Sequence, residues 1–181
     1  MSLLLLYFSI AIIISFICSI LEAVLLSVNM PYISLLEEKR PKAALLLRKH
    51  KQHIEKSIAS ILILNTLAHT FGAAGVGAQA EVIFGSTSVF YISVVLTLAI
   101  LFLSEIIPKT IGTLYWKELA PGASYAINFF IWLTYPVIII SLYITSWISK
   151  GKEVKGSLTK AELIATTLLS EDDGIIDISE L

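Results

Sequence analysis

The residues best suited to chemistry lie in one stretch, Ser104 to Gly112, at the end of a long apolar run. Glu105 precedes Pro108 by three positions. A carboxylate within hydrocarbon costs about 2.5–3.5 kcal/mol on insertion scales, so a glutamate there indicates a functional role. Pro108 has no backbone N–H, which removes the helical partner of the Ser104 carbonyl four residues earlier. A carboxylate and a freed carbonyl one turn apart are two hard oxygens, and they predict a cation site.

Two other apolar runs carry polar side chains on one helical face. Ser15, Ser19 and Glu22 recur at i, i+4 and i+7 in the first run, and Asn65 and His69 are one turn apart in the second. Hydroxyl, amide and carboxylate oxygens suit Mg²⁺ or Na⁺ better than soft metals. We therefore expect three spans to converge on one interior cation site.

Each candidate ligand also has a structural alternative. The serines can bond to their own helices, Asn65 can join two helices, and His69 is more often a packed histidine, since imidazole does not suit a hard cation. Lys109 is expected to extend to the inner interface rather than pair with Glu105. The predicted metal-site residues are Ser19, Asn65, Glu22, Glu105, Ser104 and Pro108, and the further candidates are Ser15, Thr66, His69 and Gly112.

Composition and charge placement indicate a polytopic membrane protein. Of the 181 residues 56% are hydrophobic and only 15% are charged, whereas soluble domains carry about 25% charged residues. All 13 Lys and Arg fall in residues 39–56, at 109 and 117, or in 150–160. A net charge of −1 offers no basic face for nucleic acid. The single cysteine, Cys18, excludes an internal disulfide and a thiolate cluster.

The runs predict an all-α integral membrane protein with three transmembrane helices, at about residues 3–28, 57–77 and 89–110. No Lys or Arg precedes the first run and seven follow it within residues 39–56. The positive-inside rule therefore predicts an outside N-terminus and a cytoplasmic segment at 30–56. That segment fits either an amphipathic helix at the lipid interface or a solvated connecting helix.

A last apolar run, residues 123–148, is long enough to cross the membrane, yet lysines lie on both sides of it and Pro136 divides it. We expect a re-entrant or juxtamembrane pair of half-helices at about 122–149, with a fourth crossing as the alternative. This would complete a transmembrane domain over residues 1–150. Thr159 and Glu162 have capping-box spacing, so residues 157–181 are expected to begin a cytoplasmic helical tail that is cut short.

Three motifs resemble the transmembrane domain of the cyclin M/CorC family. They are Cys18–Ser27, Leu64–Thr66 and Ser104–Lys109. The family is associated with magnesium transport, mostly export, and with cobalt resistance. The resemblance implies a homodimer of three-span protomers with juxtamembrane helices. It also implies cytoplasmic CBS domains that bind ATP beyond the end of this chain.

By matched position, the resemblance implies that Ser19, Asn65 and the backbone near Pro108 hold the metal, with Glu22 and Glu105 as a negative field or secondary ligands. The expected function is a secondary transporter in the cell membrane that exports Mg²⁺ or a related divalent cation, with Na⁺ as a candidate coupling ion. The alternative is a metal-sensing subunit that binds Mg²⁺ and modulates a partner transporter. An enzyme is not expected, because no nucleophile–base pair is present.

Overall fold

The structure is a computed structural model that describes residues 1–148, apart from the side chains of residues 88, 141, 142 and 145–148. The predicted tail at 157–181, with its capping box, lies outside the described residues. The chain divides into two compact units, Met1–Leu142 and Tyr143–Leu181. The packing described below belongs to the first.

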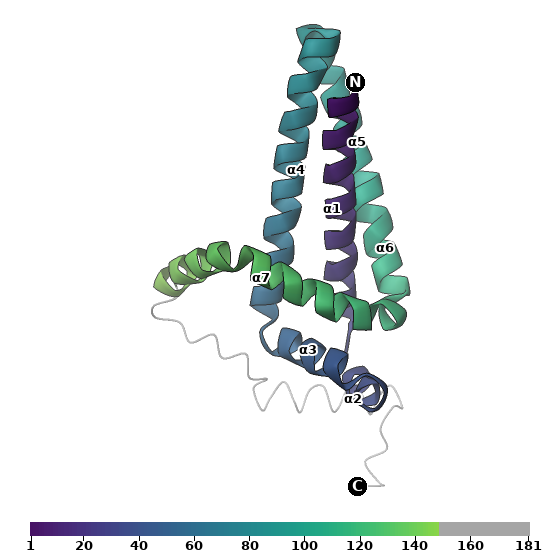
Figure 1. Cartoon of the computed structure of the whole chain (residues 1–181), viewed down its shortest axis with the longest axis vertical. Coiled ribbons are helices and arrows are strands. Elements are labelled where there is room, and N and C mark those ends of the chain that lie inside the picture. The colour runs from purple at the N-terminus through teal and green to yellow at the C-terminus, as the bar shows by residue number, and fades with distance from the viewer. Residues whose placement is uncertain (149–181) are drawn as a thin grey trace, which may run out of the picture. The chain divides into compact units, whose positions relative to one another are not determined.

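The described part of the chain is helical throughout and contains no strand, which confirms the all-α class. The elements are α1 (Ser2–Ser27), α2 (Met30–Lys39), α3 (Pro41–Gln52), α4 (Ile54–Phe84), α5 (Ser86–Ala99), η1 (Ile100–Ile106), α6 (Ile107–Leu114) and α7 (Trp116–Ile148). α1, α4 and the continuous run α5–η1–α6 lie alongside one another (Figure 1). These three are the predicted spans, although α4 extends to Phe84 through the connection expected at 78–88.

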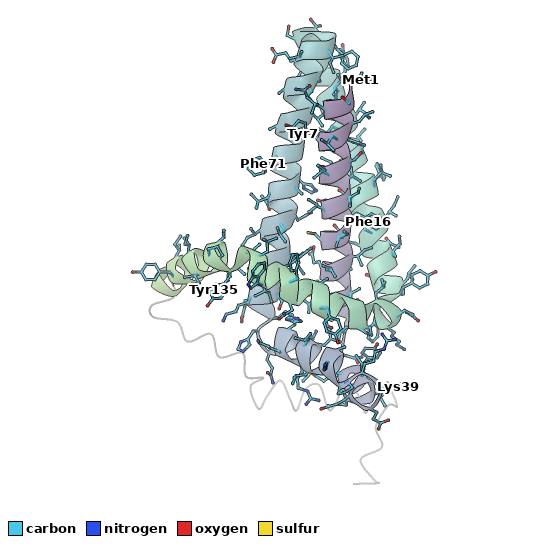
Figure 2. The ribbon with its side chains drawn as sticks, in the orientation of Figure 1. Met1, Tyr7, Phe16, Lys39, Phe71 and Tyr135 are labelled. Carbon is cyan, nitrogen blue, oxygen red and sulfur yellow. The ribbon has the colours of Figure 1, made fainter. Side chains whose placement is uncertain are left out.

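Local signals account for the helix boundaries at the basic end of these spans. Asn29 begins α2, because its side-chain Oδ1 accepts a hydrogen bond of 3.0 Å from the Tyr32 N–H. Pro31 and Pro41 occupy the first turns of α2 and α3, where a missing N–H does no harm. Figure 2 shows Met1 and Lys39 at opposite ends of this arrangement, as the charge pattern predicts.

Within residues 1–148, four helical stretches are long and apolar enough to cross a membrane, and the fourth covers most of α7. However, α7 stays beside the short helices for its whole packed length. The Tyr32 hydroxyl donates to the Lys117 carbonyl, and His50 bonds the Ser124 carbonyl. Ile138 then shares a cavity with Lys56 at the start of α4. The two hydrogen bonds and this cavity together extend over some twenty residues, about 30 Å of helix. We therefore infer that α7 is a juxtamembrane helix rather than a fourth crossing (Figure 1).

The predicted pair of half-helices is wrong, because α7 continues through Pro136 without a break. A proline inside a helix removes one hydrogen bond, to the carbonyl four residues earlier. Pro136 is exposed, and Trp132, which carries that carbonyl, is 71% exposed. Polar groups at a membrane interface can replace the lost bond there, so the helix need not break.

Glycines let α1 approach its two neighbours closely. Gly72 of α4 lies against Ala11, where an added Cβ would overlap the alanine side chain. On the other side, a Cβ at Gly112 would lie 2.9 Å from the Ile20 carbonyl oxygen and 2.8 Å from the Cβ of Ala23. Small residues at such contacts are how helices pack tightly in lipid. The spacing of α1 from α6 therefore depends on Gly112.

Gly112→Ala is expected to lower the free energy of unfolding by about 1–3 kcal/mol, because backbone must shift to admit the methyl group. Gly77→Ala is the matched control, since nothing lies within 4 Å of a Cβ built there. The control should be neutral or gain about 0.5–1 kcal/mol from the better helix former. Thermal unfolding in detergent measures both, and equal effects would show that the α1–α6 approach is not tight.

His50 joins three helices at the basic end. Its Nε2–H donates to the Ser124 carbonyl of α7 at 3.0 Å, and its Nδ1 accepts from the Ser57 hydroxyl of α4 at 3.3 Å. The side chain is 2% exposed. Burial lowers the pKa of His50 below its ordinary value of 6.5, and the neighbouring Lys49 adds to this, against the opposing effect of the Ser124 carbonyl. Folded His50 therefore stays neutral to a lower pH than it does in the unfolded chain.

Because the unfolded chain binds this proton more tightly, stability should fall as the pH drops below about 6.5, by up to about 1.4 kcal/mol per pH unit. His50→Gln should flatten that pH dependence. His53→Gln, at an exposed position, should leave it unchanged. Unfolding in detergent between pH 7.5 and 5 measures the slopes, and an unchanged slope in His50→Gln would assign the loss to other groups.

Candidate cation site

The third span changes its winding where the site was predicted. α5 passes into η1, a π-helical segment over Ile100–Ile106, immediately before Pro108. Here the Ile107 N–H bonds the Phe102 carbonyl, five residues earlier instead of four. Such segments are rare and frequently occur at functional sites. The missing N–H of Pro108 is the sequence signal for this change, but the sequence pattern alone did not predict a π-helix.

The Ser104 carbonyl, predicted to lose its helical partner, is directed at α1. It accepts a hydrogen bond of 2.6 Å from the Ser19 hydroxyl, and Ser15 Oγ lies 3.5 Å from it. Ser15, Ser19 and Ser104 are all fully buried. A hydroxyl that donates keeps its oxygen lone pairs free. Ser19 Oγ and the Ser104 carbonyl oxygen can therefore still bind a cation while they contact each other.

His69 completes a chain of hydrogen bonds across the three spans. Its Nε2 lies 2.6 Å from Ser15 Oγ, Ser15 donates to Ser104 Oγ at 3.0 Å, and Ser104 donates to the Ile100 carbonyl at 2.7 Å. One consistent assignment has His69 donating from Nε2, since each hydroxyl then donates once. In this arrangement His69 positions the serines and does not itself face a cation.

Asn65 carries the one buried side-chain oxygen or nitrogen without a hydrogen-bond partner in the described part of the chain, its Oδ1. α1 and α4 run antiparallel, with Ala11 against Gly72 and Ser15 bonded to His69. Continuing this antiparallel pairing by one helical turn in each helix places Asn65 at the same level as Ser19. An unpaired buried acceptor costs about 1–3 kcal/mol. A bound cation would supply the missing partner.

The carboxylates have different surroundings. Glu22 pairs with Lys109 at 3.2 Å, so Lys109 neither extends alone to the interface nor pairs with Glu105. Glu105 Oε1 lies 3.9 Å from His69 Nδ1, and its side chain is 36% exposed. Lys109 thus offsets the charge of Glu22. Glu105 forms no salt bridge with Lys or Arg among the described residues and lies beside His69, which contacts Ser15.

Comparison with known proteins agrees with this architecture. The family profile described as the Cyclin M transmembrane N-terminal domain matches residues 6–180. The chain belongs to the cyclin M family. The "UPF0053 protein sll1254" of Synechocystis sp. (strain ATCC 27184 / PCC 6803 / Kazusa) is 29% identical over 164 residues, which cover 91% of this chain and 47% of that protein. The chain thus spans about half the length of this curated relative. Membership of the family confirms the resemblance carried by the three motifs and identifies a multi-pass membrane protein.

In this cyclin M domain, the predicted residues fall into three groups. Ser15, Ser19, Ser104 and His69 meet directly, and Asn65 stands level with them. Glu105 lies beside this cluster through His69, Glu22 pairs with Lys109, and the buried Pro108 follows Ser104 by four positions. Gly112 packs against α1 away from the serines, and the Thr66 side chain is exposed, so neither joins the cluster.

The chemistry of the cluster is that of neutral oxygens. Within residues 1–148, no group of three His, Cys, Asp or Glu side chains is placed to hold a metal ion. The oxygen separations of 2.6 Å and 3.0 Å are close to the edge of a Mg²⁺ octahedron, about 2.9 Å for ligands at 2.0–2.1 Å. Each of these two oxygen pairs therefore has a separation that a small, hard cation could bridge.

Proposed function

We propose that this cyclin M domain is a secondary transporter that exports Mg²⁺ or a related divalent cation, with Na⁺ as a candidate coupling ion. The observation that carries the proposal is the unpartnered Oδ1 of Asn65, level with Ser19 and its contact to the Ser104 carbonyl. An unpaired buried acceptor lowers the stability of the protein, and a cation that passes through the site would bind to it. The family of the chain is consistent with this role.

Mg²⁺ gives up water reluctantly, so a dry site needs several oxygens and nearby negative charge. In the proposed site, Asn65 Oδ1, Ser19 Oγ and the Ser104 carbonyl bind the ion, and Glu105 contributes the charge. The π-helical segment allows a local change of winding without unfolding the third span. We propose that the site opens toward the basic, cytoplasmic end and that rocking of α1 against α4 and η1 releases the ion.

The rest of the assembly follows from the same proposal. Two copies of the chain would form the transporter in a cell membrane, with the N-terminus outside and the C-terminus in the cytoplasm. ATP would act through CBS domains in a longer protein rather than at this site. Orientation rests on the placement of Lys and Arg within residues 39–56 and 150–160.

The test is Mg²⁺ flux through proteoliposomes that contain only this chain, followed with a Mg²⁺-sensitive dye inside. We expect a Mg²⁺-dependent signal that Asn65→Ala abolishes and that empty liposomes lack. Binding of Mg²⁺ by calorimetry without any flux would overturn the transporter and favour the alternative, a metal-sensing subunit that modulates a partner transporter. Absence of both binding and flux would contradict both functions.

A further inference from the structure

A cavity of about 260 Å³ lies at the basic end, between α3, the first turn of α4 and the second half of α7. It shares no residue with the candidate cation site. Its lining residues include Lys49, His53 and Lys56 at the basic end, and Ile138 and Ile139 of α7. We refer to Lys49 and Lys56 as the cationic side of the cavity, and to Ile138 and Ile139 as its apolar side.

The cationic side has no acidic partner. No Asp or Glu lines the cavity, and Lys49 and Lys56 make no salt bridge within the part of the chain that the structure describes. The nearby basic residue Arg48, by contrast, pairs with Glu37 at 2.7 Å. Two lysines that converge on one cavity without a carboxylate leave a positive field for an anion to occupy.

The apolar side continues onto the outer surface of α7. Ile138 is buried, Ile139 is 48% exposed, and the neighbouring Tyr135 lines the same cavity. An aromatic residue next to exposed isoleucines on a juxtamembrane helix is typical of the boundary between headgroups and acyl chains. A purely polar anion would fill the cationic side and leave the isoleucine side without a partner.

We propose that this cavity binds one anionic phospholipid from the adjacent leaflet. Its phosphate lies between Lys49 and Lys56, with Tyr135 and Asn128 as further polar contacts, and an acyl chain follows Ile138 and Ile139. Basic cavities between helices on the cytoplasmic side are suited to such headgroups. The bound lipid would join α3 and α4 to α7, which otherwise meet there through His50.

The test compares phosphatidylglycerol with phosphatidylcholine on the purified full chain, counted as bound lipid by native mass spectrometry in detergent. Wild type should retain one phosphatidylglycerol per chain in preference to phosphatidylcholine. Each lysine near an anionic surface contributes about fivefold to binding. The double variant Lys49→Gln/Lys56→Gln should therefore bind phosphatidylglycerol about 30-fold more weakly.

The matched control is Lys39→Gln/Lys42→Gln, which removes the same charge from the same end of the protein outside the cavity. It should keep the wild-type preference. Equal binding of the two lipids by wild type, or an equal loss in both double variants, would overturn the proposal.

A second arm separates a lipid from a free phosphate. Inorganic phosphate at millimolar concentration should not displace phosphatidylglycerol from wild type, because it gains nothing from the isoleucines. Ile139→Asn should weaken binding of long-chain phosphatidylglycerol and leave the lysine-dependent charge preference intact. Displacement by inorganic phosphate, together with no effect of Ile139→Asn, would overturn the lipid assignment.

Discussion

Asn65→Ala is expected to weaken Mg²⁺ binding by this cyclin M domain about 10- to 100-fold. The estimate follows from the loss of one amide oxygen from a charged ligand, an interaction of about 1.5–3 kcal/mol. Isothermal titration calorimetry on the purified chain measures the change. The same variant should abolish flux in proteoliposomes, because the proposed site would lack Asn65 Oδ1, the oxygen that has no other partner.

The stability of the ion-free protein separates binding from structure. Asn65 Oδ1 has no hydrogen-bond partner among the described residues, so its removal breaks no hydrogen bond there. Thermal unfolding without Mg²⁺ should therefore be unchanged or slightly improved in Asn65→Ala. The stabilisation that added Mg²⁺ gives to wild type should shrink in the variant, since a ligand stabilises only the state that binds it.

Thr66→Val is the matched control for Asn65→Ala. Thr66 is the next residue of α4, and its side chain is exposed on the helix surface. The control should keep wild-type Mg²⁺ affinity. Unchanged affinity in Asn65→Ala would remove Asn65 from the site. A large loss of thermal stability in Asn65→Ala without Mg²⁺ would instead show that Asn65 serves helix packing.

Pro108→Ala is expected to lower Mg²⁺ flux at least tenfold while the protein stays folded. Alanine restores the backbone N–H that can bond the Ser104 carbonyl along the helix. That bond would compete with the Ser19 hydroxyl, which now donates to this carbonyl at 2.6 Å. It would also favour ordinary α-helical winding in place of the π-helical segment at Ile100–Ile106. Both changes remove an oxygen from the proposed site.

Thermal stability should be equal or higher in Pro108→Ala, because a proline inside a helix costs about 3 kcal/mol. Pro136→Ala is the matched control, since Pro136 also lies inside a helix but is exposed and remote from the serines. It should keep wild-type flux. Full flux in Pro108→Ala would show that the freed carbonyl does not serve transport. A collapse of stability would show that Pro108 is needed for packing.

The sequence alone predicted those features that depend on a single helix. The absence of Lys and Arg from 1–38 and 57–108 marked the membrane runs, because charge is excluded from hydrocarbon. The missing N–H of Pro108 predicted that the Ser104 carbonyl lacks its helical partner. In the structure that carbonyl accepts a hydrogen bond from Ser19 of α1. The spacing of Ser15 and Ser19 placed both on one face of α1, and both are buried against η1.

Pairing between helices required the tertiary structure. Periodicity defines the face of a helix but not its rotation or axial level against a neighbour. The contacts of Lys109 with Glu22 and of His69 with Ser15 depend on that level. So does the position of Gly112, which serves the approach of α6 to α1 instead of the cation site.

The remaining features depended on how the surrounding tertiary structure modified the local effect of each proline. Pro136 suggested a broken helix, but α7 stays continuous because the tertiary structure leaves Pro136 and Trp132 exposed, where other polar groups can replace the one lost hydrogen bond. The missing N–H of Pro108 could have produced a kink, but the structure shows π-helical winding over Ile100–Ile106, in a segment that contacts α1. Residue types and spacing thus determined the spans and the polar oxygens. Only the packed helices determined which of those oxygens meet, because that depends on contacts between distant segments.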